Sequence, residues 1–287
     1  MSTQLTDNAV AQFDSIVKHA YAEMGKIRQA VRVKSGVIGS THRFPKMGKG
    51  QATQRVPQTD VVPMNIAHTS ATATITDWIA AEYTDVFNQQ KVNYDEKKLL
   101  AHVIAGGITR REDQLIIDAL DASSTSLTVA DTIGGNDGMN VTKLRRASRL
   151  LTQGGVPMTD RYFVHSSIAL EQMLGVTPAT SMDFNSVRAL VNGEMNSYVG
   201  FEFICIEDRD EGGLPLATNN RTCFAFHGGA MGSIGLAVGI DFRTEVNYIP
   251  EKTSYLAAGL FAAGSIAIDD NGIVDVDVDE SVAVDSE

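Results

Sequence analysis

Three residues close together in the sequence have the side-chain types of a hydrolase triad: Asp160, His165 and Ser166. A triad requires an acid, an imidazole and a hydroxyl to meet in space, so that the base can take the proton of the nucleophile. The local pattern predicts a strand over residues 161–165 and, directly after it, a helix that Ser166 caps. Residues in that order cannot easily turn onto one another. We therefore interpret Ser166 as an N-cap and predict no catalytic residue here.

Other chemical signatures are also missing from the sequence. Six histidines, at positions 19, 42, 68, 102, 165 and 227, are scattered without metal-ligand spacing, and no C-x-x-C, Walker, G-x-G-x-x-G or G-x-S-x-G motif occurs. Acidic clusters at 208–211 and 269–271 lack the spacing of a calcium loop and are typical of Asx-capped turns. Cys205 and Cys223 lie in apolar runs, so we expect buried thiols and no disulfide. We predict no metal and no cofactor.

Composition indicates an ordinary globular protein of 287 residues, with 43% apolar and 21% charged residues. No run of about 18 apolar residues and no signal peptide is present, so we expect a cytoplasmic protein without a membrane partner.

The net charge of −11 is unevenly distributed: residues 1–55 carry nine Lys and Arg against three Asp and Glu, a balance of +6, and the remainder carries −17. One end of a subunit could therefore attract the other end of a neighbour, or the acidic end could simply aid solubility.

A long helix is predicted over residues 94–123, because apolar residues recur there at spacings of three, four and seven. Asp95 and Glu96 favour its N-terminus. The adjacent Gly106 and Gly107 lie inside it, and each costs about 1 kcal/mol relative to Ala. The helix either bends at this pair or something packs closely on it, or the pair divides the segment into two shorter helices.

The N-terminal region is predicted to form a helix over residues 6–33 with an apolar stripe that includes Phe13, Val17 and Tyr21. One helix cannot bury such a stripe alone, so we expect it to lie on the body of the protein or on another subunit. Residues 35–77 have no continuous apolar run and are rich in Gly, Thr and Pro. We expect two extended arms joined by a flexible tip at residues 46–51, a length typical of a functional loop or of one stabilised by partners.

The loop is basic, since it contains Arg43, Lys46, Lys49 and Arg55. Only Phe44 places an aromatic ring among these charges, which disfavours nucleic-acid binding. An acidic protein surface is the better partner.

Beyond residue 123 the pattern becomes mixed α/β. Asn140 is predicted to cap a helix, strands are expected over 198–207 and 221–226, and further strands follow over 241–249 and 256–268. The segment 273–278 alternates Val with Asp275 and Asp277, which predicts one face on a core and a row of carboxylates in water.

This order of parts resembles the major capsid proteins of tailed bacteriophages, which share the HK97-type fold. Residues 159–174 (TDRYFVHSSIALEQML) are similar to a strand and helix of the axial domain in these coats, and residues 193–207 to the stretch that follows. Residues 221–232 (RTCFAFHGGAMG) and 241–272, which contain YIPEKTSYLAAGLFAAGSIAIDDNG, are similar to the exit from the axial domain and to the closing peripheral strands.

The resemblance implies an α+β, HK97-like fold and a non-enzymatic subunit that forms the icosahedral head shell around double-stranded DNA. We expect assembly in the bacterial host cytoplasm, through hexamers and pentamers, into a virion that grips its DNA only weakly. Because Met1 lies a few residues before the arm, any scaffold would be a separate protein; a portal and decoration proteins are further expected partners. The implied division is an N-terminal arm at 1–35, an extension loop at 36–77, a peripheral domain at 78–123 and 235–280, an axial domain at 124–234 and an acidic tail at 281–287.

The resemblance also directs two hypotheses about residues. The first places Phe13, Val17, Tyr21, Arg43, Lys46, Lys49 and Arg55 in contacts between subunits, without a covalent cross-link through either lysine. The second makes Gly106 and Gly107 a hinge of the long helix. Two alternatives remain: an encapsulin-type compartment shell, and a cytoplasmic α/β enzyme with an unrecognised site.

Overall fold

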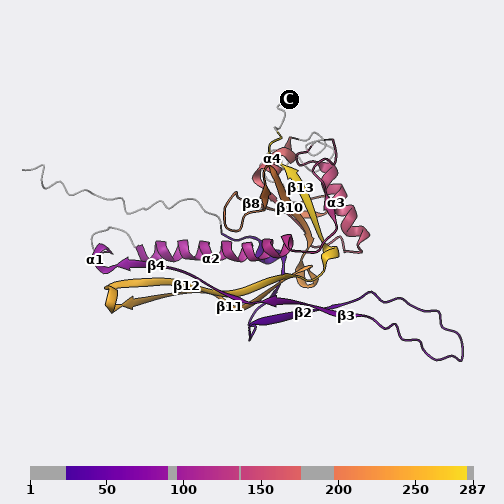
Figure 1. Cartoon of the computed structure of the whole chain (residues 1–287), viewed down its shortest axis with the longest axis horizontal. Coiled ribbons are helices and arrows are strands. Elements are labelled where there is room, and N and C mark those ends of the chain that lie inside the picture. Colours follow the sequence, from indigo (N-terminus) through magenta and orange to yellow (C-terminus); the bar gives the residue numbers. More distant parts are fainter. Residues whose placement is uncertain (1–23, 90–95, 136, 176–196, 283–287) are drawn as a thin grey trace, which may run out of the picture.

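The computed structural model describes residues 24–89, 96–135, 137–175 and 197–282. Figure 1 shows a long, thin platform, a lobe above one end of it, and a loop that projects beyond that end. The platform is built from strands and one long helix, and the lobe from a second sheet with two helices. No helix in the described ranges is long and apolar enough to cross a membrane.

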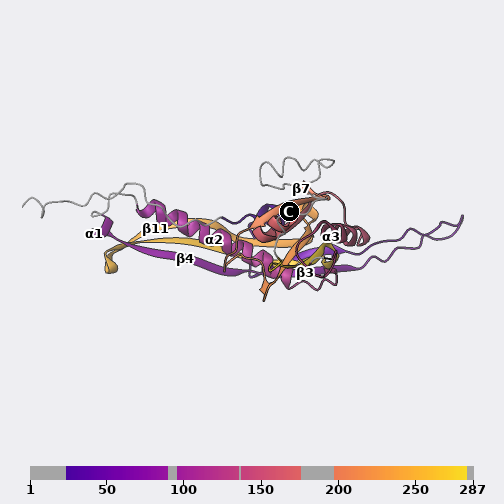
Figure 2. The same cartoon turned by 90° about the horizontal axis from the view of Figure 1, so that it is seen from above.

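The platform is a four-stranded sheet in the order β1 (Arg32–Lys34), β11 (Ile234–Ile249), β12 (Ser254–Ala267), β4 (Thr76–Asp85). β1 pairs parallel to β11, and the other neighbours are antiparallel. The helix α2 (Glu96–Asp121) lies along one face of these strands, and β4 leads into the short helix α1 (Val86–Gln89) (Figures 1 and 2). At Gly259 of β12 a Cβ atom would lie 2.5 Å from Cγ2 of Ile104, so glycine allows this close approach of helix and sheet.

The predicted long helix is confirmed as one α-helix, α2. α2 runs without interruption through Gly106 and Gly107, so the division into two shorter helices is wrong. Its buried face includes Ile104 and Ile108 near the middle, while Val103 is 49% exposed. The predicted first residues, 94 and 95, lie outside the described residues. The buried side chains of its C-terminal half reach the common core and are Ile116, Ile117 and Leu120.

The lobe contains a seven-stranded sheet in the order β5 (Thr128–Val129), β13 (Ile273–Asp279), β10 (Asn220–His227), β6 (Arg161–Ser166), β8 (Phe201–Ile206), β7 (Ser197–Tyr198), with β9 (Leu216–Ala217) on β10. The helices α3 (Val141–Gln153) and α4 (Ser167–Leu174) complete it. Asn140 caps α3 by accepting a hydrogen bond from the Lys143 amide at 2.9 Å, as predicted.

Strand β13 lies in the sheet of the lobe. The predicted peripheral domain includes residues 273–279, but β13 pairs along its whole length with β10 in the lobe. The 3-10 turn η5 (Asp270–Gly272) carries the chain from the platform into the lobe. The Val side chains of β13 are buried as expected, but Asp275 and Asp277 are only half-exposed. The predicted row of carboxylates in water is therefore wrong.

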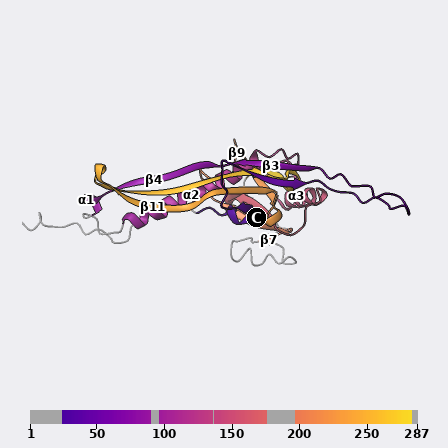
Figure 3. The same cartoon turned by 90° about the horizontal axis from the view of Figure 1, so that it is seen from below.

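Strands β2 (Thr41–Met47) and β3 (His68–Thr74) form an antiparallel hairpin of their own. Lys46 lies within β2, and the Gly48 amide donates to the Ala67 carbonyl at 2.8 Å, so the loop extends from 48 to 67. The predicted tip at residues 46–51 is therefore wrong: those residues form the base of the loop. Figure 3 shows the loop running away from the rest of the molecule.

The predicted helix over residues 6–33 is wrong in its described part. Residues Ile27–Ala30 form a single 3-10 turn, η2, and Arg32–Lys34 form the strand β1. The backbone amides of Lys26 and Ile27 donate to the carboxylate of Asp113, which holds this segment against α2 instead of continuing a helix. Residues 1–23, with Phe13, Val17 and Tyr21, lie outside the described residues.

The predicted strand over 198–207 is a hairpin instead. Val199 and Gly200 have φ of 52° and 81°, which places a tight turn between β7 and β8. Left-handed backbone at two successive residues is the conformation of a two-residue hairpin turn. The aromatic and aliphatic side chains of β8 then join those of β6 and β10 in the core that the lobe shares with the platform.

Candidate assembly surfaces

The base of the loop is fastened to its own chain at three points. Phe44 of β2 is 1% exposed and packs in a small cluster with Ala73 and Ala237. Nζ of Lys46 lies 2.8 Å from Oδ1 of Asp269, and Nζ of Lys49 donates to the Gly154 carbonyl at 2.9 Å, at the C-terminal end of α3. Two of the four basic residues predicted to contact other subunits are thus occupied within the chain.

The loop beyond this base has no packing of its own. Every residue from 48 to 67 except Ile66 is exposed. A turn is closed by Thr59, whose hydroxyl donates to the Val56 carbonyl at 2.8 Å. The exposed loop also has apolar side chains, which is costly in water unless a partner covers them. The exposed fractions are 58% for Val56, 88% for Val61, 65% for Val62 and 56% for Met64.

The other two basic residues keep free charges. Arg43 is exposed on β2 and Arg55 is exposed in the loop, and within the described residues neither makes a hydrogen bond or an ion pair. Their guanidinium groups remain available to carboxylates of another molecule.

A second exposed surface lies on the platform face opposite α2. Trp78 and Ala80 pack against the core on the helix side, and residues alternate along β4, so Ile79 and Tyr83 point the other way. Ile79 is 67% exposed and Tyr83 is 43% exposed. Their register partners on β12 are Leu260 and Leu256, both half-buried. This face therefore presents a row of apolar side chains on neighbouring strands.

The segment before β1 is held by a charged cluster at the middle of α2. Arg28 bonds Asp241 through two nitrogen atoms at 3.0 and 3.1 Å and lies 3.1 Å from Glu112. Burial raises the pKa of Glu112 to about 7 despite this arginine. Next to it, Arg209 from the lobe lies 2.9 Å from Asp113. The cluster therefore joins the N-terminal segment, α2, the lobe and β11.

The predicted hinge residues, Gly106 and Gly107, lie between one and two helical turns before this junction. No atom lies within 4 Å of a Cβ built on Gly107, and only the flexible end of Arg110 lies near one built on Gly106, at 3.3 Å. Packing therefore does not require glycine at either position. The hydroxyl of Thr109 donates to the carbonyls of Ala105 and Gly106, a contact that often bends helices.

The candidate triad does not form. Nδ1 of His165 contacts the backbone carbonyl of Ser166 at 2.8 Å, and burial lowers the pKa of this imidazole. The Ser166 hydroxyl caps α4 through the Ala169 amide and donates to Glu280 at 2.6 Å. The N-cap interpretation of Ser166 is confirmed.

The sequence did not indicate the network of hydrogen bonds and ion pairs that Arg221 forms in the lobe. Nε of Arg221 donates to Glu280 at 2.7 Å, and Nη2 of Arg221 lies 3.0 Å from Oδ1 of Asp208. Both residues are far from Arg221 in sequence, so no local spacing marks them. Asp269 caps the turn η5 through the Asn271 amide, which confirms the Asx-turn interpretation of that cluster. Among the described residues, no three acidic, His or Cys side chains are grouped as metal ligands.

Comparison with solved structures identifies the fold. A capsid subunit of the cyanophage P-SCSP1u superposes with a TM-score of 0.74 at 16% identity, covering 96% of this chain and 94% of that one. A capsid of the Helicobacter pylori bacteriophage KHP30 gives 0.74 at 11% identity with 96% and 98% covered, and a capsid of Ralstonia phage GP4 gives 0.70 at 12% with 95% of each. No curated protein sequence matches this chain. The predicted α+β, HK97-like capsid fold is confirmed.

The sequence itself shows the family. Residues 5–280 match the phage capsid protein family, which is nearly the whole chain. This span includes the platform, the lobe and the projecting loop. The function is accordingly structural, as a subunit that assembles in many copies into the shell of a virion, and the chain belongs to the phage capsid protein family.

Proposed function

We propose that this chain is the coat subunit from which hexamers and pentamers of a tailed-phage head are built, and that it catalyses no reaction. The observation that carries the proposal is the family match over residues 5–280 in a chain whose loop at 48–67 has no packing of its own. An exposed segment with four large apolar side chains becomes stable when a neighbouring copy covers it. The described residues outside this loop show no assembled catalytic group that would require another explanation.

The proposed partner of the loop is the platform of the next copy. The row formed by Ile79, Tyr83, Leu256 and Leu260 offers apolar area. Glu245, on the neighbouring strand β11, lies 3.3 Å from Arg243 and offers a carboxylate that Arg55 would share with this arginine. Protein interfaces usually have apolar side chains in contact at the centre and charged pairs at the rim, and this contact would have both. In this proposal residues 36–77 act as the extension loop, the platform as the peripheral domain and the lobe, with β13, as the axial domain.

Further partners follow from this role. We propose a separate scaffolding protein, a portal and decoration proteins, with assembly in the bacterial host cytoplasm. The packaged double-stranded DNA would be held weakly, because the chain carries a net charge of −11 and like charges repel.

The test is assembly of the purified chain, followed by negative-stain electron microscopy and analytical ultracentrifugation. Shells of uniform size that depend on residues 48–67 support the proposal. A monomer or small oligomer that remains so with its phage's scaffolding protein present contradicts it. Replacing residues 52–63 with a short Gly-Ser linker should leave the secondary structure intact, because these residues contact nothing buried, and should abolish the shells.

A further inference from the structure

One face of helix α3 carries three exposed arginines, Arg145, Arg146 and Arg149, which we call the arginine face. Arg149 donates to Gln153 at 3.2 Å, within the helix. Arg145 and Arg146 make no hydrogen bond or ion pair with any described residue. The helix contains no Asp or Glu, so its own sequence does not neutralise this face.

The fold does not need these charges. The opposite side of α3 buries Leu144, Ala147 and Leu151 in the core of the lobe. Arg145 and Arg149 are four residues apart, and like charges at this spacing destabilise a helix by a few tenths of a kcal/mol. The arginine face therefore costs a little stability in the isolated subunit and is suited to an acidic partner.

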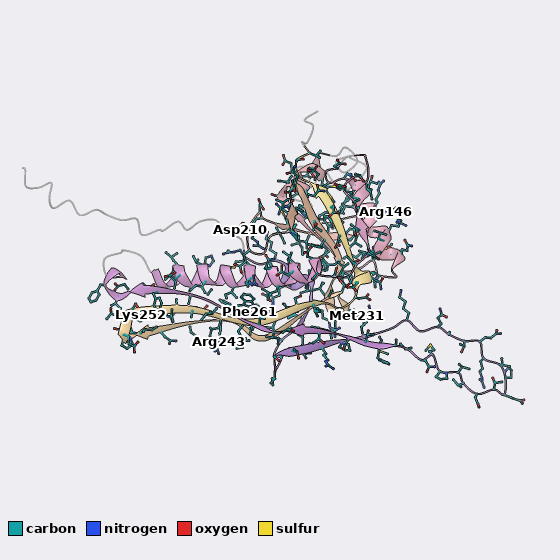
Figure 4. The ribbon with its side chains drawn as sticks, viewed as in Figure 1. Arg146, Asp210, Met231, Arg243, Lys252 and Phe261 are labelled. Atoms are coloured by element: carbon teal, nitrogen blue, oxygen red, sulfur yellow. The ribbon has the colours of Figure 1, made fainter. Side chains whose placement is uncertain are left out.

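An acidic loop lies on the other side of the same lobe, at residues 207–211. Asp210 is exposed and makes no bond or ion pair with a described residue, and the Asp208 side chain is 79% exposed although it reaches Arg221. Glu211 is 47% exposed, and its ion pair with Arg111 is long, at 3.8 Å. Figure 4 places Arg146 and Asp210 on opposite sides of the lobe, so neither group can neutralise the other within one chain.

We propose that the arginine face of one copy docks on the acidic loop at residues 207–211 of the next copy. The inference deepens the proposed function and rests on it, because it names the lobe-to-lobe contact of the assembled coat. Two different patches on opposite sides of one lobe make a heterologous contact, which repeats head to tail and closes into a ring when the rotation permits. Arginine and carboxylate are a pair that gives such a contact both orientation and specificity.

A second copy fits the arginine face better than a nucleic acid does. The complementary carboxylates are on the same chain, so every copy supplies both halves of the contact. Sites for single-stranded nucleic acid stack bases on aromatic side chains, and α3 has none. Double-stranded DNA is bound through its phosphates, so DNA retention is measured below as a separate outcome.

The first test reverses the charges and then swaps them. Arg145→Glu with Arg146→Glu should lower the particle yield by roughly tenfold, because carboxylates would face carboxylates across the contact. Asp210→Arg with Glu211→Arg should do the same, and the chain carrying all four changes should recover most of the yield. Circular dichroism checks that each variant folds. The matched control, Lys34→Glu, reverses one exposed charge on β1 outside the proposed contacts and should lower the yield much less than Arg146→Glu alone.

The second test uses one disulfide. Arg146→Cys with Asp210→Cys in one chain cannot bridge internally, because the two positions lie on opposite sides of the lobe. Particles of this variant should give a ladder of covalent multimers beyond the dimer on a non-reducing gel, while each single cysteine variant should stop at the dimer.

Separate outcomes distinguish the two proposals. Shells from the unmodified chain, together with full yield from the reversed variants and no ladder, would overturn this contact and leave the capsid function standing. Loss of DNA retention without any loss of particles on reversing the arginines would assign the face to nucleic acid and also overturn it. Failure of the unmodified chain to form shells would count against the proposed function itself.

Discussion

Nζ of Lys46, in the hairpin that carries the projecting loop, lies 2.8 Å from Oδ1 of Asp269, in the turn that joins the platform to the lobe. Both side chains are more than a third exposed, so the pair orients the hairpin more than it stabilises the fold. This contact changes the expectation for the basic loop residues: Lys46 acts first within its own subunit.

Charge swapping tests that assignment. Lys46→Glu should misplace the loop and weaken assembly in a salt-dependent manner, because it puts two carboxylates together, whereas Lys46→Glu with Asp269→Lys should restore assembly. Particle yield at several salt concentrations is the measurement. If the particle yield stayed low in the double variant, we would instead assign Lys46 to a contact between subunits.

The same pair predicts a response to acid. Burial alone would raise the pKa of Asp269, but hydrogen bonds from Lys46 and Asn271 outweigh it and lower the pKa below its usual range. A lowered pKa in the folded state means that the contribution is present above about pH 4 and is lost as the pH falls through the folded value. Asp269→Asn should therefore be less stable than the parent chain above about pH 4, and this difference in stability should shrink below that pH. Thermal unfolding followed by circular dichroism measures both.

Asp275 should respond in the opposite direction. Burial, followed by the charges of Asp277 and Asp121, raises its pKa to about 6. Its Oδ1 is buried and has no hydrogen-bond partner in the described part of the chain. The folded state thus binds a proton more tightly than the unfolded state, so stability falls as the pH rises from about 4 to above 6. Asp275→Asn should stabilise the subunit at about pH 8 and have little effect at about pH 4. Because water partly screens this half-exposed carboxylate, the gain at about pH 8 should be only on the order of 1 kcal/mol. An unchanged slope of stability against pH would contradict this.

Replacing the glycine pair in α2 distinguishes an effect on the stability of the subunit from a role as a hinge. Gly106→Ala with Gly107→Ala should stabilise the subunit by about 1 to 2 kcal/mol, since both positions are helical and have room for a methyl group. If the pair is a hinge, shells of this variant should assemble but change shape between precursor and mature forms more slowly or incompletely. Chemical denaturation measures the first effect, and electron microscopy of both particle forms measures the second. Normal expansion would leave the pair without a hinge function.

The loop should matter only to the assembly. Val61→Asp with Val62→Asp should leave the unfolding of the isolated subunit unchanged within about 0.5 kcal/mol, because both side chains are exposed, yet should prevent stable shells. Met231→Asp is the control for either single loop change, since Met231 is 88% exposed in the 3-10 turn Gly229–Met231, outside residues 36–77. Equal loss of shells in the loop variant and in the control would show that the loop makes no special contact.

Much of the local structure was readable from the sequence. The amphipathic spacing of α2, the caps at Asn140 and Ser166, the Asx turn at Asp269 and the alternation of β13 all depend on side chains within a few residues of one another. The order of these elements also carried the likeness to tailed-phage coats, because connectivity along the chain is a property of the sequence itself.

The tertiary structure decided which distant segments meet. Whether β13 joined the platform or the lobe depended on its pairing with β10, and whether Asp275 faced water depended on how the folded lobe buries it. The pairs of Lys46 with Asp269 and of Arg209 with Asp113 link residues far apart in the chain, so no periodicity could mark them. Spacing along a chain determines which face of an element a side chain occupies, but only packing in three dimensions determines what that face meets.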